Sequence, residues 1–104
     1  SKLSDLDLTG CLVVATECMD LCVESLTLAT TGEHPPPSEL VGALYGTLVP
    51  AGTVPLDLAA GVSRARDLAR VAGGRGRDLV DVTVARAVMH DAQRLLELVE
   101  ARMA

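Results

Sequence analysis

Three runs rich in proline or glycine divide this chain into four segments, and they constrain its fold more than any other feature. The runs are TGEHPPP at 31–37, PAGTVP at 50–55 and GGRGR at 73–77. Proline lacks the backbone N–H that a helix interior needs, and glycine is common just beyond helix ends. The pieces between the runs are long enough for helices. The sequence therefore predicts four helices in a single domain of 104 residues.

Local signals set the expected boundaries of these helices. Ser4 and Asp7 have the spacing of a capping box and open a first helix that reaches about residue 29. Ser38 restarts a short helix that ends before the second run. Pro55 fits the first turn of a third helix reaching about residue 72, and a fourth helix runs from about residue 77 to the end of the sequence.

The interior of such a fold has to be built almost without aromatic residues. Apolar residues make up 49% of the chain, yet Tyr45 is its only aromatic residue. Leu, Val, Ala, Met and Cys must then fill the core, which suits closely packed helices better than a sheet. The connectors are short and reverse the chain direction. We therefore expect an all-α fold, a compact four-helix bundle that is antiparallel and contains one short helix.

Helical phase predicts which side of each helix is buried. The polar positions of the first helix form one narrow stripe, so most of its circumference is apolar and it should be the most buried of the four. These polar positions are Thr16, Glu17, Asp20, Glu24 and Thr27. The apolar face of the third helix comprises Leu58, Val62, Ala65, Leu68, Ala69 and Ala72, and that of the fourth comprises Val84, Val88, Ala92, Leu95, Leu96 and Val99.

Charge and composition exclude several classes of partner. The net charge is −5, with −6 carried by residues 1–56 and +1 by residues 57–104. An acidic first half has no electrostatic attraction for a phosphate backbone, and no set of aromatic side chains is present for bases to stack on, so nucleic-acid binding is not expected. The longest uncharged run, at 40–56, is too short for a membrane span and contains glycine and proline.

The cysteines and the N-terminal residues bear on the compartment. An odd number of cysteines, three in this chain, argues against a disulfide framework. The first ten residues carry acids where a signal peptide would carry positive charge. The sequence therefore predicts a protein of the reducing cytoplasm.

The same three cysteines are candidates for metal binding. Cys11, Cys18 and Cys22 project from one side of the first helix, and Cys18 and Cys22, one turn apart, could hold a soft metal ion between them. That side is the apolar face, where a free cysteine packs as a small hydrophobe and is unreactive. We expect core packing, with no metal ion or cofactor.

His90 is the strongest candidate for chemistry. Arg86 and Arg94 lie one turn away on either side, Asp91 follows directly, and the phase of the helix predicts that His90 faces solvent. Such a group could accept a phosphoryl group, with the arginines offsetting its charge and the carboxylate fixing the imidazole tautomer. Over about ten residues MHDAQRLLELV resembles the H-box of one class of histidine kinases, which implies phosphotransfer. The other interpretation is a solvated helix face.

Two weaker patterns complete the candidates. The stretch VAGGRGRDLV at 71–80 puts glycines and arginines ahead of a helix, where backbone N–H groups can bind an anion, although a flexible connector explains it better. Glu17 and Asp20 are one turn apart and could contribute to a weak Mg²⁺ site, a pattern that surface acids also produce.

No convergent set of nucleophile, base and oxyanion donors is apparent. The preferred hypothesis is a non-enzymatic helical module that binds protein, such as a regulator, adaptor or antitoxin-like component. Histidine phosphotransfer through His90 is the alternative. The large apolar content predicts a homodimer or another stable complex. The expected interface is the second helix, with Tyr45, Leu44 and Leu48.

Overall fold

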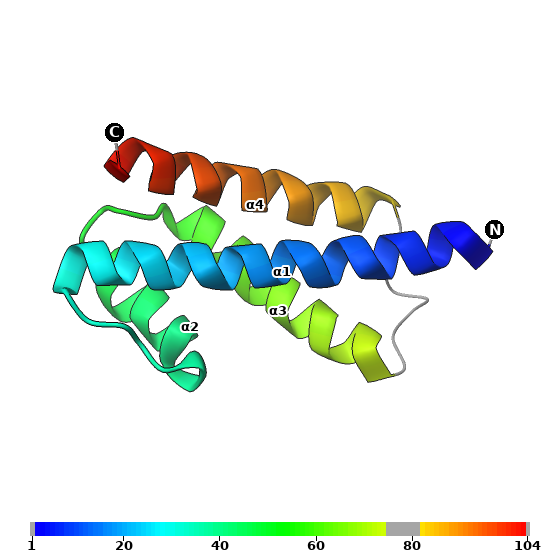
Figure 1. Cartoon of the computed structure of the whole chain (residues 1–104), viewed down its shortest axis with the longest axis horizontal. Helices are drawn as coiled ribbons and strands as arrows, with labels where there is room; N and C mark the ends of the chain where they lie inside the picture. Colours follow the sequence, from blue (N-terminus) through cyan, green and yellow to red (C-terminus); the bar gives the residue numbers. More distant parts are fainter. Residues whose placement is uncertain (1, 75–81, 104) are drawn as a thin grey trace.

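The computed structural model describes residues 2–74 and 82–103, and within these residues helices and helical turns are the only regular secondary structure (Figure 1). The elements are α1 (Lys2–Thr31), the 3-10 turn η1 (Pro37–Glu39), α2 (Leu40–Ala43), the π-helical turn η2 (Leu44–Leu48), α3 (Leu56–Gly74) and α4 (Val82–Met103). The predicted all-α fold is confirmed. The expected start of the fourth helix, near residue 77, lies outside the described residues.

Helix α1 extends slightly beyond its expected limits at both ends. It begins at Lys2, so Ser4 lies inside the helix rather than at its N-cap. It ends at Thr31, because Gly32 takes a φ of +81° and its N–H donates to the Leu28 carbonyl at 2.7 Å. Glycine adopts this left-handed conformation without steric cost, so the first predicted break does stop the helix.

The second segment is a corner rather than a regular helix. It passes from η1 through a single turn of α2 into η2, where the Val49 N–H donates to the Leu44 carbonyl at 3.0 Å. Its inner side consists of Leu40, Leu44 and Leu48, all of which are buried. Gly52, with a φ of +76°, then turns the chain into α3.

The three long helices alternate in direction (Figure 1). The second segment is too short to span the bundle, so α3 runs back against α1, and α4 returns against α3, as the short connectors predicted. Helices α1 and α4 therefore lie side by side and point the same way. Their carboxyl-terminal halves line one pocket, with Leu26 and Ala29 from α1 and Val99 and Arg102 from α4.

All the elements except η1 contribute to one core. Its largest fully buried side chains are Leu12, Met19, Leu26, Leu44, Leu48, Leu58, Leu95, Val23, Val54 and Val62. The predicted inner faces of α3 and α4 are largely correct, since Leu58, Val62 and Ala65 are buried in α3. In α4 the same holds for Val88, Ala92 and Leu95, whereas Leu96 is exposed.

The contact of α3 with Asp91 of α4 depends on a glycine. A Cβ atom on the buried Gly61 would lie 3.0 Å from Cγ of Asp91 and closer still to one carboxylate oxygen. Asp91 is held there by Arg94, whose Nη1 lies 3.8 Å from Oδ1. An alanine at this position would displace the carboxylate and loosen the contact between the helices.

We expect the effect of Gly61→Ala to depend on Asp91. With Asp91 present, the steric conflict should offset the gain in helix propensity and lower the free energy of unfolding. In an Asp91→Ala background the same change should raise it by about 1 kcal/mol, the helix preference of alanine over glycine. Urea unfolding of the four proteins measures the difference, and equal effects of Gly61→Ala in both backgrounds would contradict the proposed contact.

Candidate interaction surface

Helix α1 carries two apolar stripes of seven-residue spacing on opposite sides. The inner stripe consists of Leu12, Met19 and Leu26, with at most 1% of each residue exposed. The outer stripe consists of Val14, Leu21 and Leu28, which are 66%, 64% and 37% exposed. Each outer residue follows an inner residue by two positions, which is about 200° around a helix. A helix of this kind buries one stripe in its own domain and leaves the other uncovered.

Helix α4 has an outer apolar stripe with the same spacing. Its members are Val82, Met89 and Leu96, which are 52%, 52% and 36% exposed. The buried Val88 and Leu95 each precede a member of this stripe by one residue, or about 100° around the helix.

The two stripes lie on either side of the line where α1 meets α4. Leu28 and Val99 line the same pocket between these helices, which places Leu28 at the contact line. Val99 marks the side of α4 that meets α1, and Leu96 lies about 60° around the helix from it. Arg94 binds Asp57 and so marks the side that meets α3, and Leu96 lies about 160° from Arg94. Both stripes therefore face away from α3. We call this surface the α1–α4 face, defined as Val14, Leu21, Leu28, Val82, Met89 and Leu96.

The cysteines lie along the α4 side of α1. Cys22 is buried in the core and the half-buried Cys18 packs against it, whereas Cys11 is exposed, so the expectation of three core cysteines is wrong for Cys11. Burial, and after it the neighbouring Cys18, raises the pKa of the Cys22 thiol from 9.0 to about 12. Such a thiol is protonated and unreactive at neutral pH. Among the described residues no group of three or more His, Cys, Asp or Glu side chains is placed to hold a metal ion.

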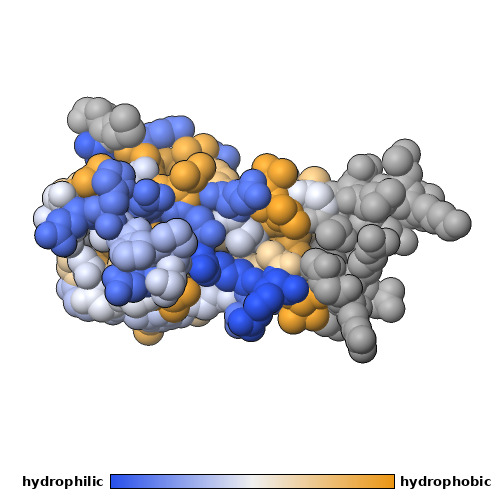
Figure 2. All heavy atoms as spheres, turned by 60° about the horizontal axis from the view of Figure 1, so that its bottom comes forward, coloured by the Kyte–Doolittle hydropathy of each residue, from blue (hydrophilic) through white to orange (hydrophobic). Residues whose placement is uncertain are grey.

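The side of the molecule formed by α2 and α3 has a different character. Figure 2 shows this side, where hydrophilic side chains run across the middle and apolar side chains appear between them in smaller groups. A polar hollow between α1, α2 and α3 is lined by Thr16, Asp20, Val41, Arg66, Asp67 and Arg70. In this hollow Arg66 binds Asp20. The Asp20 carboxylate, which together with Glu17 was the candidate for a weak Mg²⁺ site, is therefore already paired with an arginine.

Part of the polar stripe of α1 is thus turned inward. Thr16 and Thr27 are buried, and their hydroxyls donate to the Leu12 and Val23 carbonyls at 2.8 Å and 2.7 Å. Asp20 is only 34% exposed and is neutralised by Arg66. Within this helix the apolar outer stripe is therefore more exposed than Thr16, Asp20 and Thr27 of the polar stripe.

We expect the two arginine ion pairs of α3 to differ in their contribution to stability. Arg66→Gln should lower the free energy of unfolding by about 1–2 kcal/mol, because it leaves the partly buried Asp20 without its partner. Arg70→Gln is the matched control: Arg70 is 79% exposed and pairs with Asp67 at 3.2 Å, so its loss should cost less than about 0.5 kcal/mol. Thermal unfolding compares the two variants, and equal costs would contradict a structural role for the Asp20 pair.

The structure separates the residues proposed for phosphotransfer. His90 and Arg86 are exposed on α4, as expected. Arg94 binds Asp57 of α3 at 3.1 Å, and its hydrogen bond lowers the pKa of Asp57 below the ordinary value. Asp91 is 19% exposed and lies against Gly61 beside Arg94. Of the three residues expected to assist His90, Asp91 and Arg94 therefore make contacts with α3 instead.

The residues expected to form an interface on the second helix are mostly in the core. Leu44 and Leu48 are fully buried, because their side chains point inward and pack in the core. Tyr45 is 39% exposed, and its hydroxyl accepts a hydrogen bond from the Ser63 hydroxyl at 3.2 Å. Only Tyr45 of the three is available to a partner in this fold.

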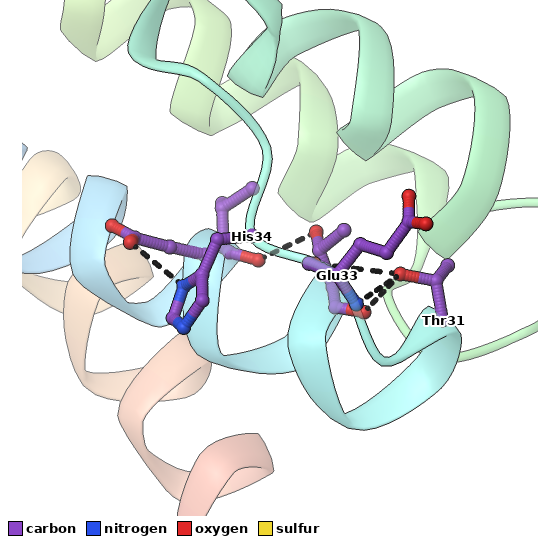
Figure 3. Close-up of polar contacts among 6 residues, drawn as sticks. Thr31, Glu33 and His34 are labelled. Atoms are coloured by element: carbon purple, nitrogen blue, oxygen red, sulfur yellow. Dashed lines mark hydrogen bonds and ion pairs between the residues drawn. The ribbon is translucent and has the colours of Figure 1, made fainter.

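The other histidine belongs to the proline-rich connector. His34 Nδ1 lies 3.0 Å from Glu24 Oε1, and the Glu33 N–H donates to the Thr31 hydroxyl at 3.2 Å (Figure 3). These contacts tie the connector back to α1, on the polar stripe and away from the cysteines. The anion site considered at 71–80 lies largely outside the described residues.

Comparison with protein-family models, with curated proteins and with solved structures finds no match. No helix in the described part of the chain is long and apolar enough to cross a membrane.

Proposed function

We propose that this chain is a non-enzymatic helical module that binds another protein chain through the α1–α4 face. The observation that carries the proposal is the pair of exposed apolar stripes along two adjacent helices. Exposed apolar residues are common singly, but a contiguous patch of them on a small domain is typical of an interaction surface. A regulator, an adaptor or an antitoxin-like component would act in this way.

The distribution of the other exposed apolar residues supports this choice of surface. Val13, Val41, Tyr45, Leu56 and Val71 come from several elements, and no helix presents three of them at seven-residue spacing. The α1–α4 face has six large apolar side chains in two parallel rows. Three free thiols on α1 are also compatible with a module that works in the reducing cytoplasm.

A photoreactive amino acid placed at position 21 in the source cell tests the proposal. We expect it to cross-link a protein, whereas the same probe at Leu56 should not. Leu56 is the matched control because it is 63% exposed, against 64% for Leu21, but lies at the start of α3. Adding Met89→Glu should abolish the cross-link at position 21. If position 21 gives no cross-linked protein, or no more than position 56 gives, the proposed function is wrong.

Phosphotransfer through His90 stays the alternative prediction. The exposure of His90 and of Arg86 favours it, and the engagement of Asp91 and Arg94 with α3 weakens it. Incubation with acetyl phosphate separates the two functions. Phosphotransfer requires an acid-labile phosphoryl group on the native chain and none on His90→Gln, whereas the binding module should show no difference between the two proteins.

A further inference from the structure

We infer that the occupant of the α1–α4 face is a second copy of this chain, packed antiparallel so that α1 lies on the partner's α1 and α4 on the partner's α4. This inference rests on the proposed function and specifies the partner. It follows from the size of the face, from the pairing of its apolar residues on reversal and from its charges.

The face is large enough for a stable dimer. Helix α4 has 22 residues, and α1 covers at least the same length beside it. A helix of this length extends about 33 Å, and two adjacent helices are about 20 Å wide, which gives a flat outline of roughly 660 Å². Side-chain relief increases the accessible area above this outline, toward the roughly 800 Å² per partner of a standard interface.

Reversal of the molecule brings apolar residues together in both rows. In α1, Leu21 stands midway between Val14 and Leu28. Reversing the helix places Val14 on the partner's Leu28 and Leu21 on the partner's Leu21. In α4 the midpoint between Met89 and Leu96 lies next to Gln93, and reversal about this point places Met89 on the partner's Leu96. Such self-complementarity is what a two-fold axis across the helices requires.

Leu21 and the midpoint between Met89 and Leu96 lie at nearly the same height along the molecule. The pocket between α1 and α4 places Leu26 level with Val99 and Ala29 level with Arg102. Because both helices rise by the same distance per residue, each residue of α1 is level with the α4 residue whose number is about 73 higher. Leu21 is therefore level with residue 94, one position from Gln93. A single two-fold axis can then serve both helices: it pairs the three residues of the α1 row with one another, and it pairs Met89 with the partner's Leu96 in the α4 row.

The charges on the rim favour this antiparallel arrangement. Arg86 and Glu100 are exposed beside the α4 row, seven residues on either side of Gln93. Reversal places Arg86 on Glu100 of the partner subunit, and the symmetric pair forms at the other end. In the parallel alternative α1 would lie on the partner's α4. Residues 10–31 of α1 include acids and no basic residue, so their carboxylates would face the like-charged Glu97 and Glu100.

Sedimentation equilibrium of the purified chain at micromolar concentrations is the first test. We expect a dimer, and we expect Leu21→Glu to weaken it by at least about 100-fold, since two carboxylates would meet at the axis. Leu56→Glu, at the matched exposed position outside the face, should leave the dimer intact. Circular dichroism checks that the variants stay folded, and Met89→Glu provides an independent disruption of the same face.

Disulfide formation then tests the direction of packing in a Cys11→Ser, Cys18→Ser background. Leu21→Cys should oxidise to a covalent dimer, because this residue meets its own copy at the axis. Val14→Cys should not oxidise with itself, since the two copies would be about 21 Å apart, but it should pair with Leu28→Cys in a mixture.

Each outcome decides one point. A parallel dimer would give no Leu21→Cys disulfide, and a dimer that survives both Leu21→Glu and Met89→Glu would place the interface elsewhere; either result overturns this inference. A monomeric native chain would overturn it too. If the probe at position 21 still captures a different protein in the cell, only self-association has failed and the proposed function stands.

Discussion

Replacing Leu44 with alanine is expected to lower the free energy of unfolding by about 2–5 kcal/mol. Leu44 is fully buried where the second segment covers the end of the bundle, so the shorter side chain would leave a cavity among closely packed neighbours. The cost should appear in urea unfolding followed by circular dichroism.

The neighbouring Tyr45 is the control for this prediction. It is 39% exposed and its contacts include one exposed hydrogen bond to Ser63, so Tyr45→Ala should cost about 1 kcal/mol or less. Equal costs for the two variants would show that Leu44 does not occupy the core position described. The pair also separates a packing residue from a surface residue within one short segment.

Cys22 is expected to react with thiol reagents at least about 1000-fold more slowly in the folded chain than in urea. Burial and the adjacent Cys18 raise its pKa from 9.0 to about 12, and each pKa unit reduces the thiolate fraction about tenfold at a given pH. Labelling followed by peptide mass spectrometry measures each cysteine separately. A folded-state rate within tenfold of the rate in urea would contradict the burial of this thiol.

The same pKa shift has a consequence for stability at high pH. The folded state favours the protonated thiol of Cys22, so this contribution is fully present below pH 9 and is lost as the pH rises from 9 toward 12. Cys22→Ala should remove this part of the pH dependence. The ratio of the labelling rates in the folded and unfolded chains and the unfolding free energy should therefore change over the same pH range.

The helix boundaries could be predicted from the sequence because the signals are local. The break at 31–37 and the turn at 50–55 depend on the backbone preferences of Gly32, Gly52 and Pro55. These preferences act within a few residues, so they require no knowledge of the fold. The buried faces of α3 and α4 were also predictable, since each of these helices has one dominant apolar side.

The outer surface of α1 could not be assigned in the same way. The sequence shows that α1 is apolar around most of its circumference, but periodicity alone does not indicate which apolar side meets the rest of the chain. The answer depends on where α4 and the second segment pack. Arg66 also reaches across from α3 to bind Asp20, which draws part of the polar stripe inward.

The expected interface on the second segment was misplaced for a related reason. Tyr45 was the only aromatic residue, which suggested an anchor for a partner, and Leu44 and Leu48 were adjacent to it. The short segment instead uses both leucines to cover the core. The signal for the α1–α4 face was present in the spacing of Val14, Leu21 and Leu28, and it can be recognised once their exposure is known.

The parallel packing of α1 on α4 also determines the order in which the protein can fold during synthesis. The inner stripe of α1 packs against α4, with Leu26 and Val99 separated by 73 residues in the sequence. Contacts of this range form late because a long loop has to close first. Until α4 has left the ribosome, the side of α1 that packs on α4 and its outer apolar stripe are both uncovered on the nascent chain, so this helix is open to chaperones and to aggregation.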